Sequence, residues 1–320
     1  MEAAFFHAAV GACLALMVYV GTLVVPRGTP STVLVTLVSG AALSALASRL
    51  FKPTPNLERT KVMTTCGHTL LIIDPQNDFH PGGSLAIPTA DEDAERIAAL
   101  IRSRAHEIDR IVVTLDSHQR IHIAHGVFWT NDQGEHPPPF TTITREDIAR
   151  GTWRAVDAKS QAAAEEYAER LEERGKKICV WPEHCIIGSP GHNVRAVILD
   201  AVNYWAVARM KEVTFFWKGQ NCLTEMYSAL RAEVPVPSDE RTVNTGLIRA
   251  LRESSRVLVC GQALSHCVNF TVRDLVEIYK DLGSITILRD CTSAVPGFEE
   301  TGRAFLAEME AKGVRVESSE

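Results

Sequence analysis

The sequence predicts an α/β protein in which a mostly parallel sheet is covered by helices. Two observations lead to this fold class. Short apolar runs without apolar/polar alternation recur along the chain, and such runs are typical of strands buried on both faces. Amphipathic stretches of helical period separate most of these runs, and alternating strands and helices favour a parallel sheet between helical layers. A chain of 320 residues has room for one large domain of this kind or for two domains.

Composition narrows the classes of partner and compartment. The formal net charge is -6 and the sequence pI is about 6.0, with no basic stripe, so we expect no nucleic-acid partner. The chain has eight cysteines, none in a spaced CxxC set, and several lie in predicted core strands. We therefore interpret them as reduced thiols in a reducing compartment rather than as a disulfide framework.

The N-terminal part predicts a membrane hairpin. Residues 3–25 carry no formal charge and are long enough to cross a bilayer as a helix. A turn at 26–31 leads to a second, shorter apolar run at 32–47, whose small residues suit close packing on the first. A cleaved signal peptide is the alternative, but Glu2 and the missing positive n-region argue against it. We thus expect two transmembrane helices within 1–51 and a lipid bilayer as partner.

Charge also predicts the orientation of this hairpin. Only Arg27 lies in the turn, whereas a basic cluster follows the second run (Arg49, Lys52, Arg59 and Lys61). The positive-inside rule then places both chain ends, and with them the domain that follows, on the cytoplasmic side. The polar, proline-containing stretch at 52–65 is expected to be a linker, and 66–318 a single domain.

The order of elements in that domain follows from the periodicity. Predicted strands lie at 69–74, 110–116, 177–181, 213–219, 256–261, 284–290 and 313–318. Predicted helices include 91–106, 162–174, 194–210 and 265–280. The segment 126–161 has weak periodicity and a "HPPPF" turn, so we expect a long insertion or lid there.

Chemically capable side chains stand where the predicted strands end. These residues are Asp74, Asp116, His184, Lys218 and, after a short turn, Cys267. Ligands of open α/β sheets collect at the carboxyl ends of strands, so we expect these groups to converge there. Each alone has a plain structural explanation, such as a helix cap for an aspartate or a solvated surface lysine.

Cys267 is a candidate nucleophile. Attack on a carbonyl requires thiolate, and a free cysteine supplies only a few per cent of it at pH 7. The predicted helix start contributes roughly 0.3–1 kcal/mol, which is less than one pKa unit. A cation and a proton acceptor are therefore needed, and Lys218 and Asp74 are the candidates.

A second cluster has the composition of a metal site. Asp116 and His118 stand two residues apart just past a strand, and His184 follows another strand end. One carboxylate and two imidazoles suit a divalent Zn, Fe or Mn ion with positions left for water or substrate. His122 is a candidate further ligand, or a residue that hydrogen-bonds to a ligand.

The other two histidines of this region, His125 and His136, are expected at the surface.

Five short motifs carry a family resemblance. The motifs "IIDPQNDF", "DSHxxxH", "WPEHC", "KG" and "GxAxxHCVxxT" occur in this order. Residues 68–316 resemble the nicotinamidase branch of the isochorismatase-like cysteine hydrolases. The resemblance implies a Rossmann-like, three-layer αβα fold, here preceded by the N-terminal hairpin. The hairpin and the long insertion depart from compact members of the family.

The resemblance also implies residue roles. The catalytic triad maps to Asp74, Lys218 and Cys267, and the metal ligands map to Asp116, His118 and His184. An oxyanion hole maps to the backbone N–H groups of Ala263 and Cys267, with a cis peptide expected between Gln262 and Ala263. Phe79 and Trp181 map to the apolar substrate pocket, to which Tyr227 and Glu225 are brought by "KGQNCLTEMYSAL".

The implied reaction is hydrolysis of nicotinamide to nicotinate and ammonia through a Cys267 thioester, with a divalent ion, zinc foremost, as cofactor. A related amidase acting on a ureido or carbamoyl compound is one alternative, although such relatives generally lack the metal set. A membrane-tethered binding protein without turnover is another, and the intact triad argues against it. Assembly into a homo-oligomer stays open.

Overall fold

A six-stranded sheet forms the centre of the fold. The computed structural model describes residues 66–320, and the predicted N-terminal hairpin and the predicted linker both lie outside these residues. The strands in spatial order are β10 (Arg315–Glu317), β9 (Ile285–Leu288), β8 (Ser254–Gly261), β1 (Cys66–Ile73), β2 (Ile108–Asp116) and β7 (Thr214–Lys218). Every neighbouring pair in this sheet is parallel, which confirms the predicted α/β class.

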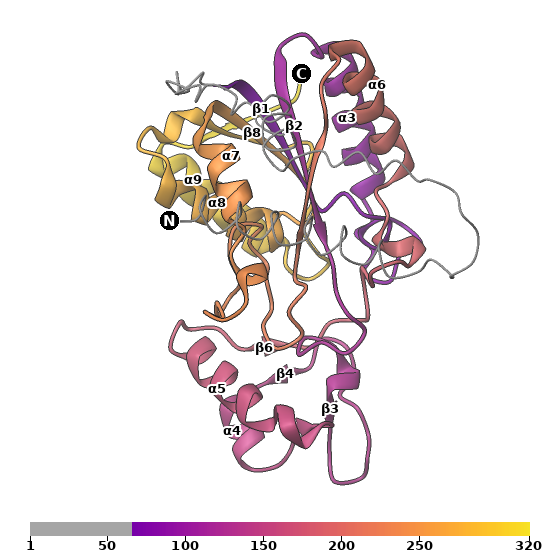
Figure 1. Ribbon diagram of the computed structural model, residues 1–320, viewed down its shortest axis with the longest axis vertical. Coiled ribbons are helices and arrows are strands. Elements are labelled where there is room, and N and C mark those ends of the chain that lie inside the picture. The colour runs from indigo at the N-terminus through magenta and orange to yellow at the C-terminus, as the bar shows by residue number, and fades with distance from the viewer. Residues whose placement is uncertain (1–65) are drawn as a thin grey trace, which may run out of the picture. The chain divides into compact units, whose positions relative to one another are not determined.

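Helices cover both faces of the sheet (Figure 1). α3 (Ala90–Ser103) and α6 (Ala196–Arg209) pack against each other on one face. α7 (Thr245–Arg252), α8 (Cys267–Ile278) and α9 (Glu299–Lys312) supply side chains to the core on the other face. The result is the three-layer αβα arrangement that the sequence predicts.

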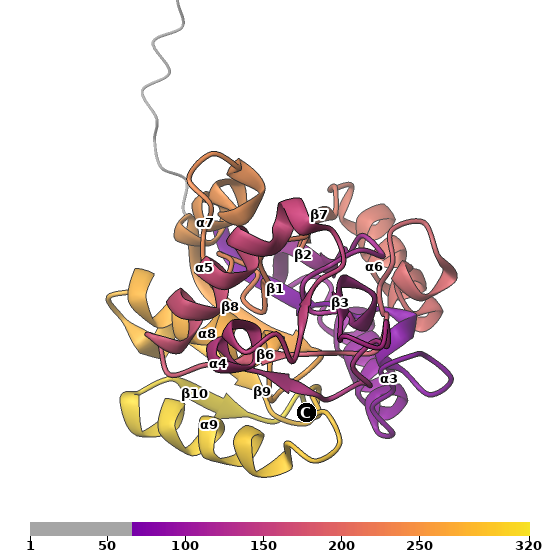
Figure 2. The same ribbon diagram turned by 90° about the horizontal axis from the view of Figure 1, so that it is seen from below.

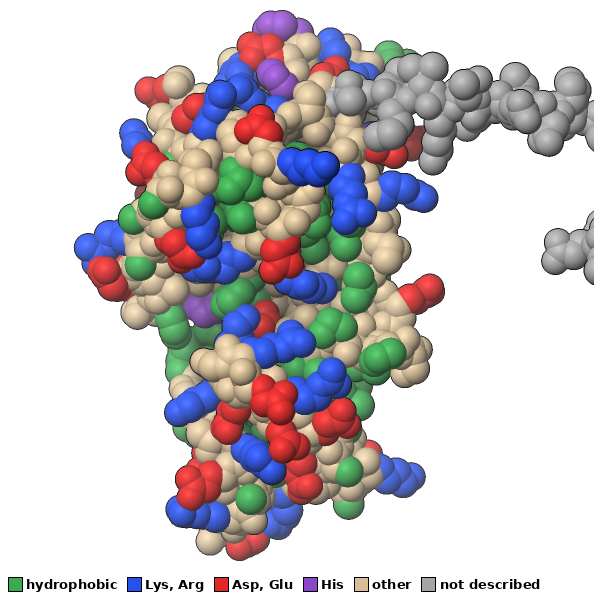
Figure 3. Space-filling view, turned by 90° about the vertical axis from the view of Figure 1, so that its left-hand side faces the viewer, with side chains coloured by type: hydrophobic (Ala, Val, Ile, Leu, Met, Phe, Trp, Pro, Cys, Tyr) green, Lys and Arg blue, Asp and Glu red, His purple; other side chains and the backbone are tan. Residues whose placement is uncertain are grey.

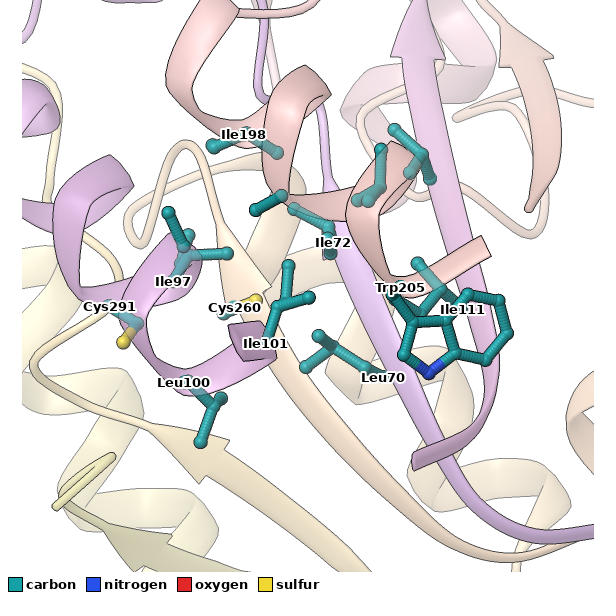
Figure 4. Packing of buried hydrophobic residues seen from close by; sticks show 14 of the residues in the cluster. Leu70, Ile72, Ile97, Leu100, Ile101, Ile111, Ile198, Trp205, Cys260 and Cys291 are labelled. Atoms are coloured by element: carbon teal, nitrogen blue, oxygen red, sulfur yellow. The ribbon is translucent and has the colours of Figure 1, made fainter. Parts of the chain in front are cut away.

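The central strand β1 shows why its sequence lacks alternation. Leu70 and Ile72 point into the core under α3 and α6, as Figure 4 shows, while Leu71 and Ile73 point into the opposite core. All four side chains have no solvent exposure. Because successive strand residues face opposite sides, burial on both faces requires an unbroken apolar run.

The expected insertion forms a lobe with its own small core (Figures 1 and 2). Its elements are β3 (Trp129–Thr130), β4 (Thr142–Ile143), α4 (Arg145–Ala149), β5 (Arg154–Ala155), α5 (Gln161–Glu172) and β6 (Ile178–Cys179). Thr144 and Asp147 cap α4 reciprocally. The buried Trp129, Ile143 and Tyr167 belong to this core, which the weak periodicity of the segment did not predict.

Two predicted strands do form, but the pairing of one and the burial of the other differ from the prediction. The run at 177–181 was expected in the parallel sheet, but β6 pairs antiparallel with β4 in the lobe. Its two-residue length and its place after α5 keep it in that local core. The run at 213–219 was expected to be buried on both faces, whereas β7 is the edge strand and Phe215 and Trp217 are exposed.

The surface and the helix lengths bear on two expected partners. On the face seen in Figure 3, basic and acidic side chains are interspersed without a field of one sign. Among residues 66–320, no helix combines the length and apolar character needed to cross a bilayer.

Candidate active site

Four neighbouring strands deliver the predicted residues to one edge of the sheet. Asp74 directly follows β1, Asp116 ends β2 and Lys218 ends β7. β8 leads through a short turn to Cys267, the first residue of α8. The strand-end prediction is therefore confirmed in its geometry, because these side chains lie in direct contact.

Lys218 contacts three other side chains of the cluster. Its Nζ atom lies 3.1 Å from Asp74 Oδ2, 3.0 Å from Asp116 Oδ1 and 3.5 Å from Cys267 Sγ. The ammonium group also donates to the Met226 carbonyl oxygen at 2.9 Å, and the side chain is only 1% exposed. Burial disfavours the charge, but the two carboxylates outweigh burial and hold the pKa of Lys218 well above its usual value.

Asp74 and Cys267 share a proton site. The Thr114 hydroxyl donates to Asp74 Oδ1 at 2.6 Å, which leaves Oδ2 for Lys218 and the thiol. Burial raises the pKa of the Cys267 thiol well above its usual value, and the Lys218 charge opposes this only in part. Burial also raises the pKa of Asp74, against the pull of Lys218. The resting sulfur thus keeps its proton, and Asp74 is the base within reach.

The turn before Cys267 presents free backbone donors. The peptide bond between Gln262 and Ala263 is cis, as expected. Neither the Ala263 N–H nor the Cys267 N–H has an acceptor within the described part of the chain. Gln262 is held from both ends, since its Nε2 donates to Asp93 at 2.9 Å and its Oε1 accepts from the Ser293 N–H at 3.3 Å. Two N–H groups beside the sulfur suit a developing oxyanion.

The predicted metal ligands also converge. His118 Nε2 lies 3.5 Å from Asp116 Oδ1, and His184 Nε2 lies 3.3 Å from Asp116 Oδ2. Nδ1 of His184 points at the Pro182 carbonyl oxygen at 2.8 Å, and Nδ1 of His118 points at the His184 carbonyl oxygen at 3.4 Å. A carbonyl only accepts, so both Nδ1 atoms carry hydrogen, and each Nε2 atom is left beside the carboxylate to bind a proton or a metal ion.

This donor set fits a cation. Buried lone pairs that face a carboxylate repel it unless a positive charge lies between them. Burial lowers the pKa of His118, yet Asp116 and Glu225 overcome burial and raise it to about 9. In the chain alone, a proton on His118 thus supplies the positive charge that a divalent ion would supply.

The structure adds residues that sequence reasoning did not assign as ligands. Glu225 Oε1 lies 3.4 Å from His118 Nε2, and its Oε2 has no hydrogen-bond partner in the described chain. His118, His122 and Glu225 form one group with metal-ligand geometry, and His118, His125 and His184 form another. Glu225 stands seven residues after Lys218, in the segment that was expected near the pocket, but nothing in the sequence indicated that it faces His118.

His125 was expected at the surface, and this prediction is wrong. Its ring is fully buried, 5.0 Å from the His118 ring between centroids, and Nδ1 lies 3.1 Å from the Arg120 carbonyl oxygen. Burial lowers the pKa of His125 to about 2, so it stays neutral and its Nε2 is a free lone pair. The missed signal is a third histidine within eight residues of a D-x-H motif. His136 is exposed, as expected.

Gly219, the glycine of the "KG" motif, makes room for this cluster. Its φ of +75° lies in the left-handed region. A Cβ atom there would stand 2.9 Å from Asp116 Oδ1 and 3.1 Å from His118 Nε2. A side chain would therefore displace the candidate metal ligands.

A pocket lined mainly by aromatic and apolar side chains opens onto the sulfur. Phe79, Trp181 and Tyr227 line it as predicted, and the Trp181 indole N–H donates to the Tyr227 hydroxyl at 3.0 Å. His266, next to the nucleophile, is a wall residue that sequence reasoning did not assign, with its ring 5.0 Å from that of Trp181. Burial lowers the pKa of His266 to about 4, so this ring is uncharged near neutral pH.

Comparison with known proteins agrees with this geometry. No family model matches the sequence. The chain is 27% identical over 254 residues to the nicotinamidase of Escherichia coli (strain K12), covering 77% of this chain and 92% of the relative. It is 27% identical over 235 residues to the nicotinamidase of Acinetobacter baylyi, covering 73% and 84%. The solved yeast nicotinamidase has 23% identity and a TM-score of 0.55, covering 78% of this chain and 99% of that one.

Fold and site together define a three-layer α/β protein with a buried cysteine, beside a lysine and an aspartate, at the strand ends. Within this class, the chain is similar to the curated nicotinamidases, in agreement with the resemblance that its motifs carry.

Proposed function

We propose that the protein hydrolyses nicotinamide to nicotinate and ammonia. The observation that carries this proposal is the contact of Lys218 Nζ with both Asp74 and Cys267 at the floor of an aromatic pocket. The similarity to nicotinamidases over most of their length supports the choice of substrate. A flat pyridine ring suits a pocket walled by Phe79, Trp181 and Tyr227.

The first half of the reaction forms a thioester. Asp74 takes the proton of the Cys267 thiol while sulfur attacks the amide carbon, so that the S–C bond forms as the carbonyl oxygen becomes negative. The N–H groups of Ala263 and Cys267 receive this oxygen. Asp74 then gives its proton to the amide nitrogen, the C–N bond breaks and ammonia leaves.

Water completes the cycle. Asp74 takes a proton from water as its oxygen attacks the thioester carbon, the C–S bond breaks, and the proton returns to sulfur. Lys218, 3.1 Å from Asp74, lowers the pKa of this carboxyl group and so opposes the larger, raising effect of burial. Thr114 fixes the orientation of the carboxyl group.

Asp116, His118, His184 and Glu225 would hold the divalent ion, with His122 and His125 beside them. An ion held there would supply a Lewis acid at the end of the substrate pocket. Four ligand groups of mixed imidazole and carboxylate type suit zinc, and also iron or manganese.

Two other functions predict different results. An amidase for ureido or carbamoyl compounds has no use for the buried histidine cluster, which therefore argues against it. A binding protein without turnover has no need for an intact Asp74, Lys218 and Cys267 contact.

The test is ammonia release by the purified full-length protein from nicotinamide, pyrazinamide, a ureido acid and a carbamoyl amine. We expect turnover of the two aromatic amides and none of the other compounds. Preference for a carbamoyl or ureido substrate would replace the proposed function. Absence of turnover on the whole panel, with tight nicotinamide binding, would favour the binding protein.

We also propose that the apolar N-terminal sequence anchors the enzyme in a membrane with its catalytic domain on the cytoplasmic side. Support comes from the uncharged run at 3–25 and from the basic residues after the second run. The measurement is carbonate extraction combined with protease protection of intact membranes. Release of the full-length chain by carbonate would contradict the anchor, and a protected domain would contradict the orientation.

A further inference from the structure

Exposed apolar side chains concentrate on one part of the domain. Six of the nine large hydrophobic side chains that are exposed in the described chain lie between residues 199 and 217. They are Leu199, Tyr204, Val207 and Met210 in and after α6, and Phe215 and Trp217 in β7. Val207 is 74% exposed and Met210 is 88% exposed. Several large apolar side chains exposed on two neighbouring elements are typical of an interaction site.

The strand in this region has an unpaired edge. β7 is the last strand of the sheet and pairs with β2 on one side only. The Ser117 N–H donates to the Lys218 carbonyl oxygen at 2.9 Å, so Lys218 directs its backbone groups toward β2. Strand geometry alternates, so Phe215 and Trp217 direct theirs outward. Within the described residues these outward groups have no partner.

The side chains of the same two residues lie on the α6 side of the sheet. The register pairs Phe215 with Val113 and Trp217 with Leu115, and both partners belong to the core under α3 and α6. In α6, Leu199, Asn203 and Val207 recur every fourth residue and therefore share one face of the helix. Exposed helix and strand residues thus border the same edge of the molecule.

We propose that this edge is the interface of a homodimer, in which β7 pairs antiparallel with β7 of a second copy. A two-fold axis through Phe216 places Phe215 opposite Trp217 of the other copy, twice. Both residues direct their N–H and C=O groups outward, so each such pair exchanges two hydrogen bonds. The joined sheet has α6 of both copies on the same face, where their exposed stripes adjoin.

The unpaired edge of β7 needs another β-strand as its binding partner. A bilayer surface would cover the apolar side chains but leave the outward backbone groups without partners. A strand of another protein chain would cover the apolar side chains and also form hydrogen bonds with the outward backbone groups. The strand of a second copy fits because the register about Phe216 is self-complementary, as a two-fold interface demands.

The first experiment is sedimentation equilibrium of the full-length protein in a mild detergent. We expect a dimer for the wild type, and a dissociation constant at least about tenfold higher for Phe215→Lys and for Val207→Lys. The matched control is Val156→Lys, which introduces the same charge at a 56% exposed valine of the lobe. This control should sediment as the wild type does.

The second experiment tests the register. Phe216→Cys should form an intermolecular disulfide on mild oxidation, because the two Phe216 positions face each other at about 4.5 Å between Cα atoms. Thr214→Cys, on the same strand with the same native cysteines, should not, since its counterpart is Lys218. A monomeric wild type, a dimer that Phe215→Lys leaves intact, or equal cross-linking of the two cysteine variants would overturn the proposal.

Discussion

At the residue scale, the site contains buried charged groups, and each is stabilised by the opposite charge or hydrogen bond of its neighbours. Lys218 has two carboxylates and a thiol as neighbours, and Asp74 has Lys218 and Thr114. Removing one partner leaves a buried charge without its counter-charge, which lowers the free energy of unfolding by roughly 3–5 kcal/mol. The sequence could place each group at a strand end, but the order of strands in space decides which of them touch.

Alkylation measures the protonation state of Cys267. Burial raises its pKa well above the usual value, so thiolate should be scarce at neutral pH and should increase as the pH rises toward this pKa. We expect modification of Cys267 by iodoacetamide, followed by peptide mass spectrometry, to accelerate steadily from about pH 6 to about pH 10.

Lys218→Met removes the charge that lowers this pKa, so alkylation of the variant at a given pH should be slower than in the wild type. A fast rate that does not change with pH would mean that the resting sulfur is already a thiolate.

Glu225→Gln tests the ligand that sequence reasoning did not assign. The variant keeps the shape of the side chain but loses the negative charge beside His118. We expect its affinity for zinc to fall by about ten- to a hundredfold, read by competition with a chromophoric chelator. His136→Gln, at an exposed histidine, is the control and should bind the ion as the wild type does. Unchanged affinity in Glu225→Gln would remove this residue from the ligand set.

At the element scale, strand ends and the turns after them carry the chemistry. β1, β2 and β7 end in Asp74, Asp116 and Lys218, and α8 begins at Cys267. The polypeptide must turn sharply at each of these points, and Gly219 is the turn residue that stands closest to the metal ligands.

Gly219→Ala and Gly134→Ala separate crowding from backbone strain. Both glycines have positive φ, +75° and +80°, but only Gly219 has atoms within reach of an added Cβ. Each substitution should lower the free energy of unfolding by about 1 kcal/mol through strain. Only Gly219→Ala should also lose the bound ion, because its Cβ displaces Asp116 and His118. Urea unfolding and elemental analysis check this, and equal ion content in both variants would contradict it.

At the scale of the whole molecule, the periodicity of the sequence predicted the strands and helices whose burial follows one regular pattern along their length. β1 is an unbroken apolar run because both of its faces are buried, and the helices at 91–106 and 265–280 match α3 and α8 closely. Periodicity failed where a short run belongs to a local core, as with β6 in the lobe. It also failed at β7, whose apolar run reflects an exposed edge rather than a buried centre.

In the candidate active site, too, residues on regular elements could be predicted and residues on irregular loops could not. Asp74, Lys218 and Cys267 follow long, regular strands, so their meeting point could be predicted. Glu225 and His125 reach the cluster through irregular loops, whose paths depend on tertiary contacts such as the packing of the lobe against the domain. No local pattern in the sequence encodes such a path.

The central claim is that Cys267 carries the acyl group of nicotinamide during turnover. The most direct measurement is acid quenching of the enzyme during turnover, followed by mass spectrometry of the peptides that contain each cysteine. We predict a nicotinoyl adduct on Cys267 that hydroxylamine removes, and no adduct on the buried Cys260 or Cys185. Cys267→Ala should bind nicotinamide, form no adduct and release no ammonia above background. An adduct on another residue, or full ammonia release by Cys267→Ala, would contradict the account.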